Sequence, residues 1–150
     1  MTHIPLTIIG PKKKNLRKLL LNFYGCYGLG QRVNYDNVSI AALEKGWTVC
    51  HAHVRGGNEK GHKWHSSAQG DNRVRTWLDV EECVGYLIRE QYTNPALLFL
   101  QSSSAGAIHL WNIINRKPYL YKGAIFRAPF LDVLTSLMDP SQPLSNTDYE

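Results

Sequence analysis

The sequence predicts an α/β domain in which a parallel sheet is flanked by helices. Short apolar runs of strand length alternate with longer segments whose apolar residues recur every three or four positions. The chain has 150 residues, of which 43% are hydrophobic and 19% are charged. It is therefore long enough to bury a core and too apolar to be disordered.

Five runs are expected to form strands. The most apolar is Leu19-Leu20-Leu21-Asn22-Phe23-Tyr24, whose continuous hydrophobicity is typical of a strand buried on both faces. Gly10, Gly25 and Pro129 close three of the runs. The expected strands are 4–9, 19–24, 47–53, 96–101 and 124–128.

Helical spacing is clearest between Val74 and Ile88, where it predicts a helix of about four turns. Further helices are expected over 37–45, from the turn near Ser104 to Asn115, and over 131–138. Residues 55–72 are polar, contain four glycines and are expected to form a long loop. Loops of that length in a compact domain are usually functional.

Ser102-Ser103-Ser104-Ala105-Gly106 separates a predicted strand from a predicted helix. This is the context in which a Gly-x-Ser-x-Gly elbow exposes a nucleophilic serine, although Ser102 here replaces the first glycine. The motif alone also fits an ordinary turn. In a parallel sheet, however, this turn and the loops after residues 24 and 54 meet at one edge, where sites form. That placement favours Ser104 as a nucleophile.

Several other kinds of site are not expected. The net charge of +5 is concentrated around Lys12-Lys13-Lys14, which is interpreted as a solvated loop rather than a nucleic-acid surface because no aromatic residues interleave with it. No apolar run is long enough to span a membrane. His62 and His65 lack further ligands for a metal, and the glycines at 25, 28 and 30 do not follow the order of dinucleotide binders, so no cofactor is expected. Three widely spaced cysteines suit a reducing compartment, and a cytoplasmic location is expected.

Four blocks occur in an order that resembles the prolyl oligopeptidase family of serine peptidases, most of all its oligopeptidase B and prolyl endopeptidase-like branch. They are Tyr24-Gly25-Cys26-Tyr27-Gly28, His53-Val54-Arg55-Gly56-Gly57-Asn58-Glu59, Ser104-Ala105-Gly106 and Ala128-Pro129-Phe130-Leu131-Asp132-Val133-Leu134. The resemblance implies an α/β-hydrolase fold and hydrolysis of short peptides through an acyl-enzyme on Ser104 in an intact relative.

The resemblance also implies roles for individual residues. The hydroxyl of Tyr24 and the backbone N–H of Ala105 match the two donors that stabilise the oxyanion. Tyr27 matches a ring that lines the substrate pocket. Asp148 and Glu150 match an acidic pair that recognises a basic side chain of the substrate; the alternative is two solvated residues.

Members of the family have a β-propeller and place the Asp and His of the catalytic triad after the serine, and neither feature is found in residues 1–150. We therefore expect a partial peptidase domain, truncated at its C-terminal end, with an unpaired sheet edge that a protein partner could cover. Two alternatives remain open: a non-catalytic interaction module or inactive remnant, and an esterase or thioesterase of the same fold.

Several further charged or titratable side chains carry expectations of their own. Arg55 and Glu59 either pair with each other, as the resemblance suggests, or are solvated separately. Asp79, Glu81 and Glu82 are expected to be surface groups of the long helix or contacts at its end. His109 lies five residues after Ser104 on a helix, so it is not expected to face the serine hydroxyl.

Overall fold

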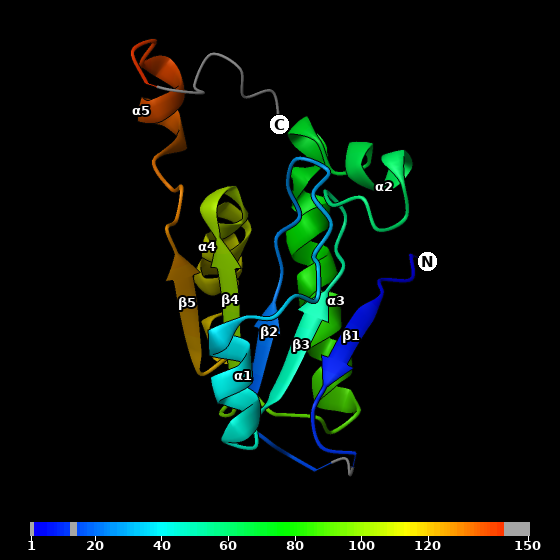
Figure 1. The fold of residues 1–150 in the computed structure, drawn as a ribbon. Coiled ribbons are helices and arrows are strands. Elements are labelled where there is room, and N and C mark those ends of the chain that lie inside the picture. The colour runs from blue at the N-terminus through cyan, green and yellow to red at the C-terminus, as the bar shows by residue number, and fades with distance from the viewer. Residues whose placement is uncertain (1, 13–14, 143–150) are drawn as a thin grey trace.

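The computed structural model describes residues 2–12 and 15–142, which form a five-stranded sheet with helices on both faces (Figure 1). The strands are β1 (Leu6–Ile9), β2 (Leu19–Asn22), β3 (Thr48–Ala52), β4 (Leu98–Ser103) and β5 (Gly123–Arg127). The helices are α1 (Asn37–Glu44), α2 (His62–Ser66), α3 (Val74–Arg89), α4 (Ala107–Arg116) and α5 (Val133–Met138). Every predicted strand and helix is present, with ends within two residues of those expected.

The strand order is β1-β3-β2-β4-β5, and four of the five strands are parallel. β1 runs antiparallel to β3, with Leu6 opposite Ala52, so the expectation of a wholly parallel sheet is wrong at this edge. Between β1 and β2, residues 10–12 and 15–18 are described and include no helix. Strands joined without a crossover helix commonly run in opposite directions, because a parallel return needs a dozen or more residues.

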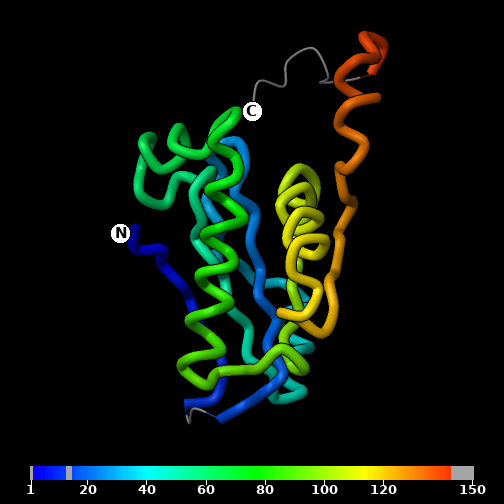
Figure 2. Tube along the Cα trace, turned by 180° about the vertical axis from the view of Figure 1, so that it is seen from behind, coloured from blue at the N-terminus to red at the C-terminus, as the bar shows by residue number. Residues whose placement is uncertain are grey.

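The main core lies between the sheet and the helices α3 and α4, which cover the same face (Figure 2). The strands contribute alternate side chains to this core, as in Leu19 and Leu21 of β2. The buried stripe of α3 meets them through Val80, Val84 and Leu87. The helical spacing in the sequence predicted the helix, but its buried face also includes Thr76 and Asp79, whereas Leu78 is 39% exposed.

The opposite face, which α1 covers in part, changes from apolar to polar along the strands (Figure 1). Leu20 of β2 has Val49 and Phe99 beside it on the neighbouring strands. One pleat further on, the corresponding row is Asn22, His51 and Gln101, each only 6% exposed. A polar layer thus leads toward the carboxyl ends of the strands, where the candidate site lies.

Residues 55–72 are not a continuous loop, since they contain α2 and the first part of a 3₁₀ helix over Gly70–Arg73. α2 is only five residues long and has a single buried side chain, Trp64, whose Nε1 donates a hydrogen bond to the Val54 carbonyl at 3.0 Å. One apolar residue cannot produce a helical periodicity, which explains why the sequence pattern missed this helix.

β5 pairs only with β4 within the described part of the chain, and α5 extends beyond it on an arm away from the sheet (Figures 1 and 2). Leu134 and Met138 of α5 are 73% and 75% exposed. That a protein partner covers this edge stays a prediction.

Candidate active site

Ser104 occupies a sharp turn between β4 and α4. It is exposed, it is the first residue of a 3₁₀ helix over Ser104–Gly106, and its φ of +47° lies in the left-handed region. Such a conformation costs a non-glycine residue roughly 1–3 kcal/mol and is held by its surroundings. Here the backbone N–H of Phe130 donates to the Ser104 carbonyl at 3.0 Å.

The turn packs directly against the end of β2. A Cβ at Gly106 would lie 2.7 Å from the Ser102 hydroxyl oxygen and 2.8 Å from the Tyr24 carbonyl oxygen, so only glycine fits there. Ser102 is buried and donates a hydrogen bond to the Phe23 carbonyl at 2.8 Å. This bond explains how a serine is accommodated at the first glycine position of the elbow pattern.

Tyr24 therefore lies beside the serine turn. It follows β2 directly, and the preceding residue, Phe23, donates its N–H to the Gln101 carbonyl of β4 at 3.2 Å. Tyr24 and Ser103 line the same hollow, which has a volume of about 610 Å³. Ala105 is the second residue of the 3₁₀ helix, and the first N–H groups of a helix have no acceptor within it.

Tyr27 lies in the same loop as Tyr24. Its ring is 39% exposed, and its φ of +56° marks a second left-handed residue close to the site. The loop is closed by two backbone hydrogen bonds, from Leu29 to Cys26 and from Gly28 to Gly56, each 3.0 Å long. Asp148 and Glu150, the predicted acidic pair, lie outside the described residues.

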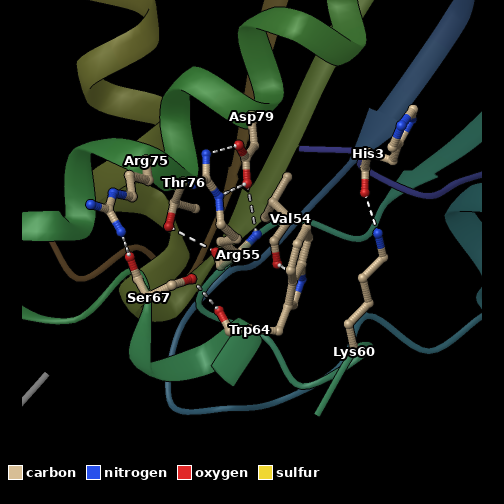
Figure 3. A network of polar contacts seen from close by, with 9 residues as sticks. All are labelled: His3, Val54, Arg55, Lys60, Trp64, Ser67, Arg75, Thr76 and Asp79. Carbon is tan, nitrogen blue, oxygen red and sulfur yellow. Dashed lines mark hydrogen bonds and ion pairs between the residues drawn. The ribbon is translucent and has the colours of Figure 1, made fainter. Parts of the chain in front are cut away.

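Arg55 pairs with Asp79, not with Glu59 (Figure 3). Asp79 accepts hydrogen bonds from the backbone N–H of Arg55 at 3.0 Å, from Nε at 2.9 Å and from Nη2 at 2.5 Å. The carboxylate is 2% exposed, so its predicted surface position is also wrong. Hydrogen bonding to this carboxylate raises the pKa of Arg55, in spite of partial burial.

The Arg55 pair fixes the loop that supports Tyr24. Thr76 of α3 donates its hydroxyl to the Arg55 carbonyl at 2.8 Å (Figure 3). A Cβ at Gly56, whose φ is +95°, would lie 2.0 Å from the Gly25 carbonyl oxygen. The loops after β2 and β3 are thus in backbone contact, and glycine is required where they meet.

Glu59 braces the other side of the same loop. Its Oε1 accepts the Gln31 backbone N–H at 2.7 Å and lies 3.5 Å from Nδ1 of His53. Burial acts to raise the pKa of Glu59, but the interactions with His53 and Gln31 outweigh it, and the net pKa is lowered. Glu59 and His53 line the same hollow as Tyr24 and Ser103.

His109 is buried under the Tyr24 loop and, as expected, does not interact with the serine. Its Nε2 lies 3.3 Å from both the Cys26 thiol and the Gly25 carbonyl oxygen. Burial, with a smaller contribution from the charge of Arg73, lowers the pKa of His109 to about 4, so the ring is neutral at pH 7. The sequence carries no signal for this contact, because Cys26 and His109 are far apart and each belongs to a mostly apolar segment.

The described residues contain neither a cluster of metal ligands nor a membrane-spanning helix. Among residues 2–12 and 15–142, no three His, Cys, Asp or Glu side chains are grouped as a metal ion would require. No helix in the same part of the chain is both long and apolar enough to cross a bilayer.

The sequence profile of the prolyl oligopeptidase family matches residues 33–150, which is most of the chain and includes the serine turn. The chain belongs to the prolyl oligopeptidase family. The predicted resemblance is therefore confirmed at the level of the family.

Relatives in this family align with nearly all of the chain. The prolyl endopeptidase-like protein of Xenopus laevis is 32% identical over 99% of the chain and 22% of its own length. The dipeptidyl aminopeptidase BI of Pseudoxanthomonas mexicana is 30% identical over 99% of the chain and 21% of its own length. The chain thus spans about a fifth of the length of the curated relatives that it matches.

Solved structures of the family confirm the fold class. Oligopeptidase B from Trypanosoma brucei, in a closed form with covalently bound antipain, superposes with a TM-score of 0.89 at 30% identity. That comparison covers 96% of this chain and 21% of the other. Oligopeptidase B from Leishmania major gives the same TM-score and the same identity, over 20% of its chain. The α/β-hydrolase fold of a family peptidase is therefore established for this chain.

Proposed function

We propose that Ser104 is the nucleophile of a serine peptidase and that the loops around it supply the oxyanion site. In this reaction the Ser104 oxygen attacks the carbonyl carbon of a peptide bond while a base takes its proton. The C–N bond then breaks, the protonated amine leaves, and water hydrolyses the resulting ester. The base and its orienting carboxylate are assigned to a His and an Asp outside residues 1–150, as the family resemblance implies.

The observation that carries this proposal is the conformation and the position of Ser104. An exposed serine with a left-handed φ lies between a parallel strand and a helix, at the carboxyl edge of the sheet. The same conformation presents the hydroxyl in nucleophile elbows. A serine in an ordinary solvent-exposed turn has no need of the close backbone contact that Gly106 makes with Tyr24.

Tyr24 and Ala105 are the proposed oxyanion donors. The tetrahedral intermediate of peptide hydrolysis carries a negative oxygen, which a phenol hydroxyl and a backbone N–H at a helix start can both bind. Losing one such donor costs roughly 3–4 kcal/mol of transition-state stabilisation in related enzymes. Tyr24 lies beside the turn and Ala105 follows the serine, so the two donors approach the reacting carbonyl from different loops.

The proposed substrates are short peptides. The names of several relatives, including oligopeptidase B and dipeptidyl aminopeptidase BI, support this class. Tyr27, exposed next to Tyr24, is proposed to pack against the substrate, and Asp148 with Glu150 to bind a basic side chain through charge-assisted hydrogen bonds. The three free, buried cysteines are in keeping with a cytoplasmic location.

A fluorophosphonate probe tests the assignment of the nucleophile. In the full-length protein we expect covalent labelling that maps to Ser104 and is lost in Ser104→Ala. The matched control is Ser66→Ala, which removes another exposed serine on α2 and is expected to keep the labelling. Tyr24→Phe is expected to slow the labelling by a hundredfold or more, the loss typical of one oxyanion donor. Labelling that persists in Ser104→Ala would reject the proposal.

One observation favours a second candidate, a non-catalytic module. No group among the described residues hydrogen-bonds to the Ser104 hydroxyl, and His109 interacts with Cys26 and Gly25 instead. Without a base, a serine hydroxyl is a weak nucleophile. Peptide turnover by the purified 150-residue chain that is abolished by Ser104→Ala would exclude this candidate, whereas labelling only in a longer protein would support both the nucleophile and its external base.

A further inference from the structure

A second hollow lies at the end of the sheet opposite to Ser104. We refer to it as the basal hollow; it has a volume of about 460 Å³, and its polar lining includes Lys12, Asn15, Arg17, Thr48 and Tyr92. β1 ends there and β2 and β3 begin there, because β1 runs antiparallel to β3, which is parallel to β2 (Figure 1). The site proposed for catalysis is at the other ends of β2 and β4, so the two sites are separate.

The backbone around the basal hollow is fixed by hydrogen bonds. The N–H of Arg17 donates to the Tyr92 carbonyl at 3.3 Å, and the carbonyl of Arg17 accepts the hydroxyl of Thr93 at 3.0 Å. Thr93 is completely buried. The N–H of Thr48 donates to the Lys18 carbonyl at 2.9 Å. The backbone positions of Arg17 and Thr48 are therefore fixed, which lowers the entropy cost of binding a ligand between their side chains.

The charge in the basal hollow is entirely positive. Lys12 and Arg17 line it, and none of the described residues that line it is acidic. Neither cation forms an ion pair with any residue of the described chain. Nε of Arg17 is buried and has no hydrogen-bond acceptor there. Because Arg17 lines the hollow without a carboxylate partner among the described residues, its positive charge would stabilise an anion bound there.

We propose that the basal hollow binds a small tetrahedral oxyanion, either inorganic phosphate or the phosphate group of a monoester. The guanidinium of Arg17 provides N–H donors in a fixed plane, and Lys12 adds a second positive charge. The amide of Asn15 and the hydroxyl of Thr48 provide neutral donors along the same lining. The cations line one concave space, whereas a polyanion would need a track of charges with stacking side chains between them.

Calorimetric titration of the protein with inorganic phosphate and with phenyl phosphate, at constant ionic strength, tests the proposal. Saturable binding of one anion per chain is expected. Arg17→Gln should weaken it by at least about tenfold, as expected for the loss of a charge-assisted hydrogen bond. Lys12→Gln should weaken it less, because Lys12 is exposed. Melting curves establish whether each variant is folded. If Arg17→Gln does not fold, the affinity of Lys12→Gln for phosphate tests the proposal.

Two matched variants keep this test independent of the proposed peptidase function. Lys63→Gln removes an exposed lysine from α2, at the other end of the molecule, and Ser104→Ala removes the proposed nucleophile; both should bind phosphate as the parent protein does. Absence of saturable phosphate binding would overturn the proposal, as would equal weakening by Lys63→Gln. Binding confined to single-stranded RNA or to phosphatidic acid vesicles would replace it with a polyanion or membrane surface.

Discussion

The carboxylate of Asp79 is predicted to be worth about 3 kcal/mol to the free energy of unfolding. Removing one partner of a buried ion pair typically costs about 3–5 kcal/mol, because the other charge stays buried without its counterion. The Arg55 side chain is 18% exposed, so its guanidinium can regain some water, and we expect Asp79→Ala to fall at the low end of that range. At about 2–4 °C per kcal/mol for a chain of this size, the melting temperature should drop by roughly 6–12 °C.

A double-mutant cycle separates the ion pair from the rest of the loss. The bond from the Arg55 backbone N–H to Asp79 is lost in any variant without the carboxylate, and it accounts for about 1 kcal/mol. The remaining coupling of about 2 kcal/mol should be recovered when Arg55→Met is combined with Asp79→Ala. Urea unfolding at pH 7 measures each free energy, and Glu82→Ala, an exposed acid on the same helix, is the control expected to change it by less than about 0.5 kcal/mol. A loss below about 1 kcal/mol for Asp79→Ala, or no recovery in the double variant, would refute this account of the loop.

Three further predictions concern the interior. The pKa of His109 is about 4 in the folded protein and about 6.5 in the unfolded chain. Its contribution to stability is therefore complete above pH 6.5 and is lost as the pH falls toward 4, by up to about 3 kcal/mol. Urea unfolding at pH 7 and 4.5 should show a steeper loss of stability for the parent than for His109→Leu, and equal losses would contradict the assignment. Gly106→Ala should destabilise the folded protein by about 1–3 kcal/mol, because the added methyl would crowd Ser102. Gly85→Ala, in open space on α3, should not destabilise it. Thermal melts of the two variants that coincide would argue against the close contact at Gly106. The three buried thiols, with the pKa of Cys50 raised to about 12 by burial, should react with a disulfide reagent only after unfolding; a thiol that reacts rapidly in the folded protein would disprove this.

Much of the fold could be predicted because its signals are local. The apolar runs and the spacing from Val74 to Ile88 each depend on residues close together in the chain, and all the predicted strands and helices are found. The failures occur where a segment is too short for a period to appear, as in α2, or where direction depends on a distant strand, as in β1.

In the candidate site too, features that depend on neighbouring residues could be predicted, and contacts between distant residues could not. The residues around Ser104 predict a sharp turn, and the structure has an exposed turn there; the role of Ser104 as a nucleophile stays a prediction. The sequence leaves Arg55 either paired with Glu59, four residues away, or solvated separately, whereas the structure pairs it with Asp79 on α3. The contact between Cys26 and His109 was not anticipated, because neither residue type indicates a particular partner.

The sequence by itself determined the alternation of strands and helices, the family, and the place of the serine turn at the carboxyl edge of the sheet. Those features follow from hydrophobic spacing and short motifs, which act over a few residues. Only the tertiary structure decided the direction of β1, the ion pair that holds the Arg55 loop, and the burial of His109 beneath Tyr24. Each of these depends on which surfaces meet after folding, and one-dimensional spacing does not encode the distance between segments far apart in the chain.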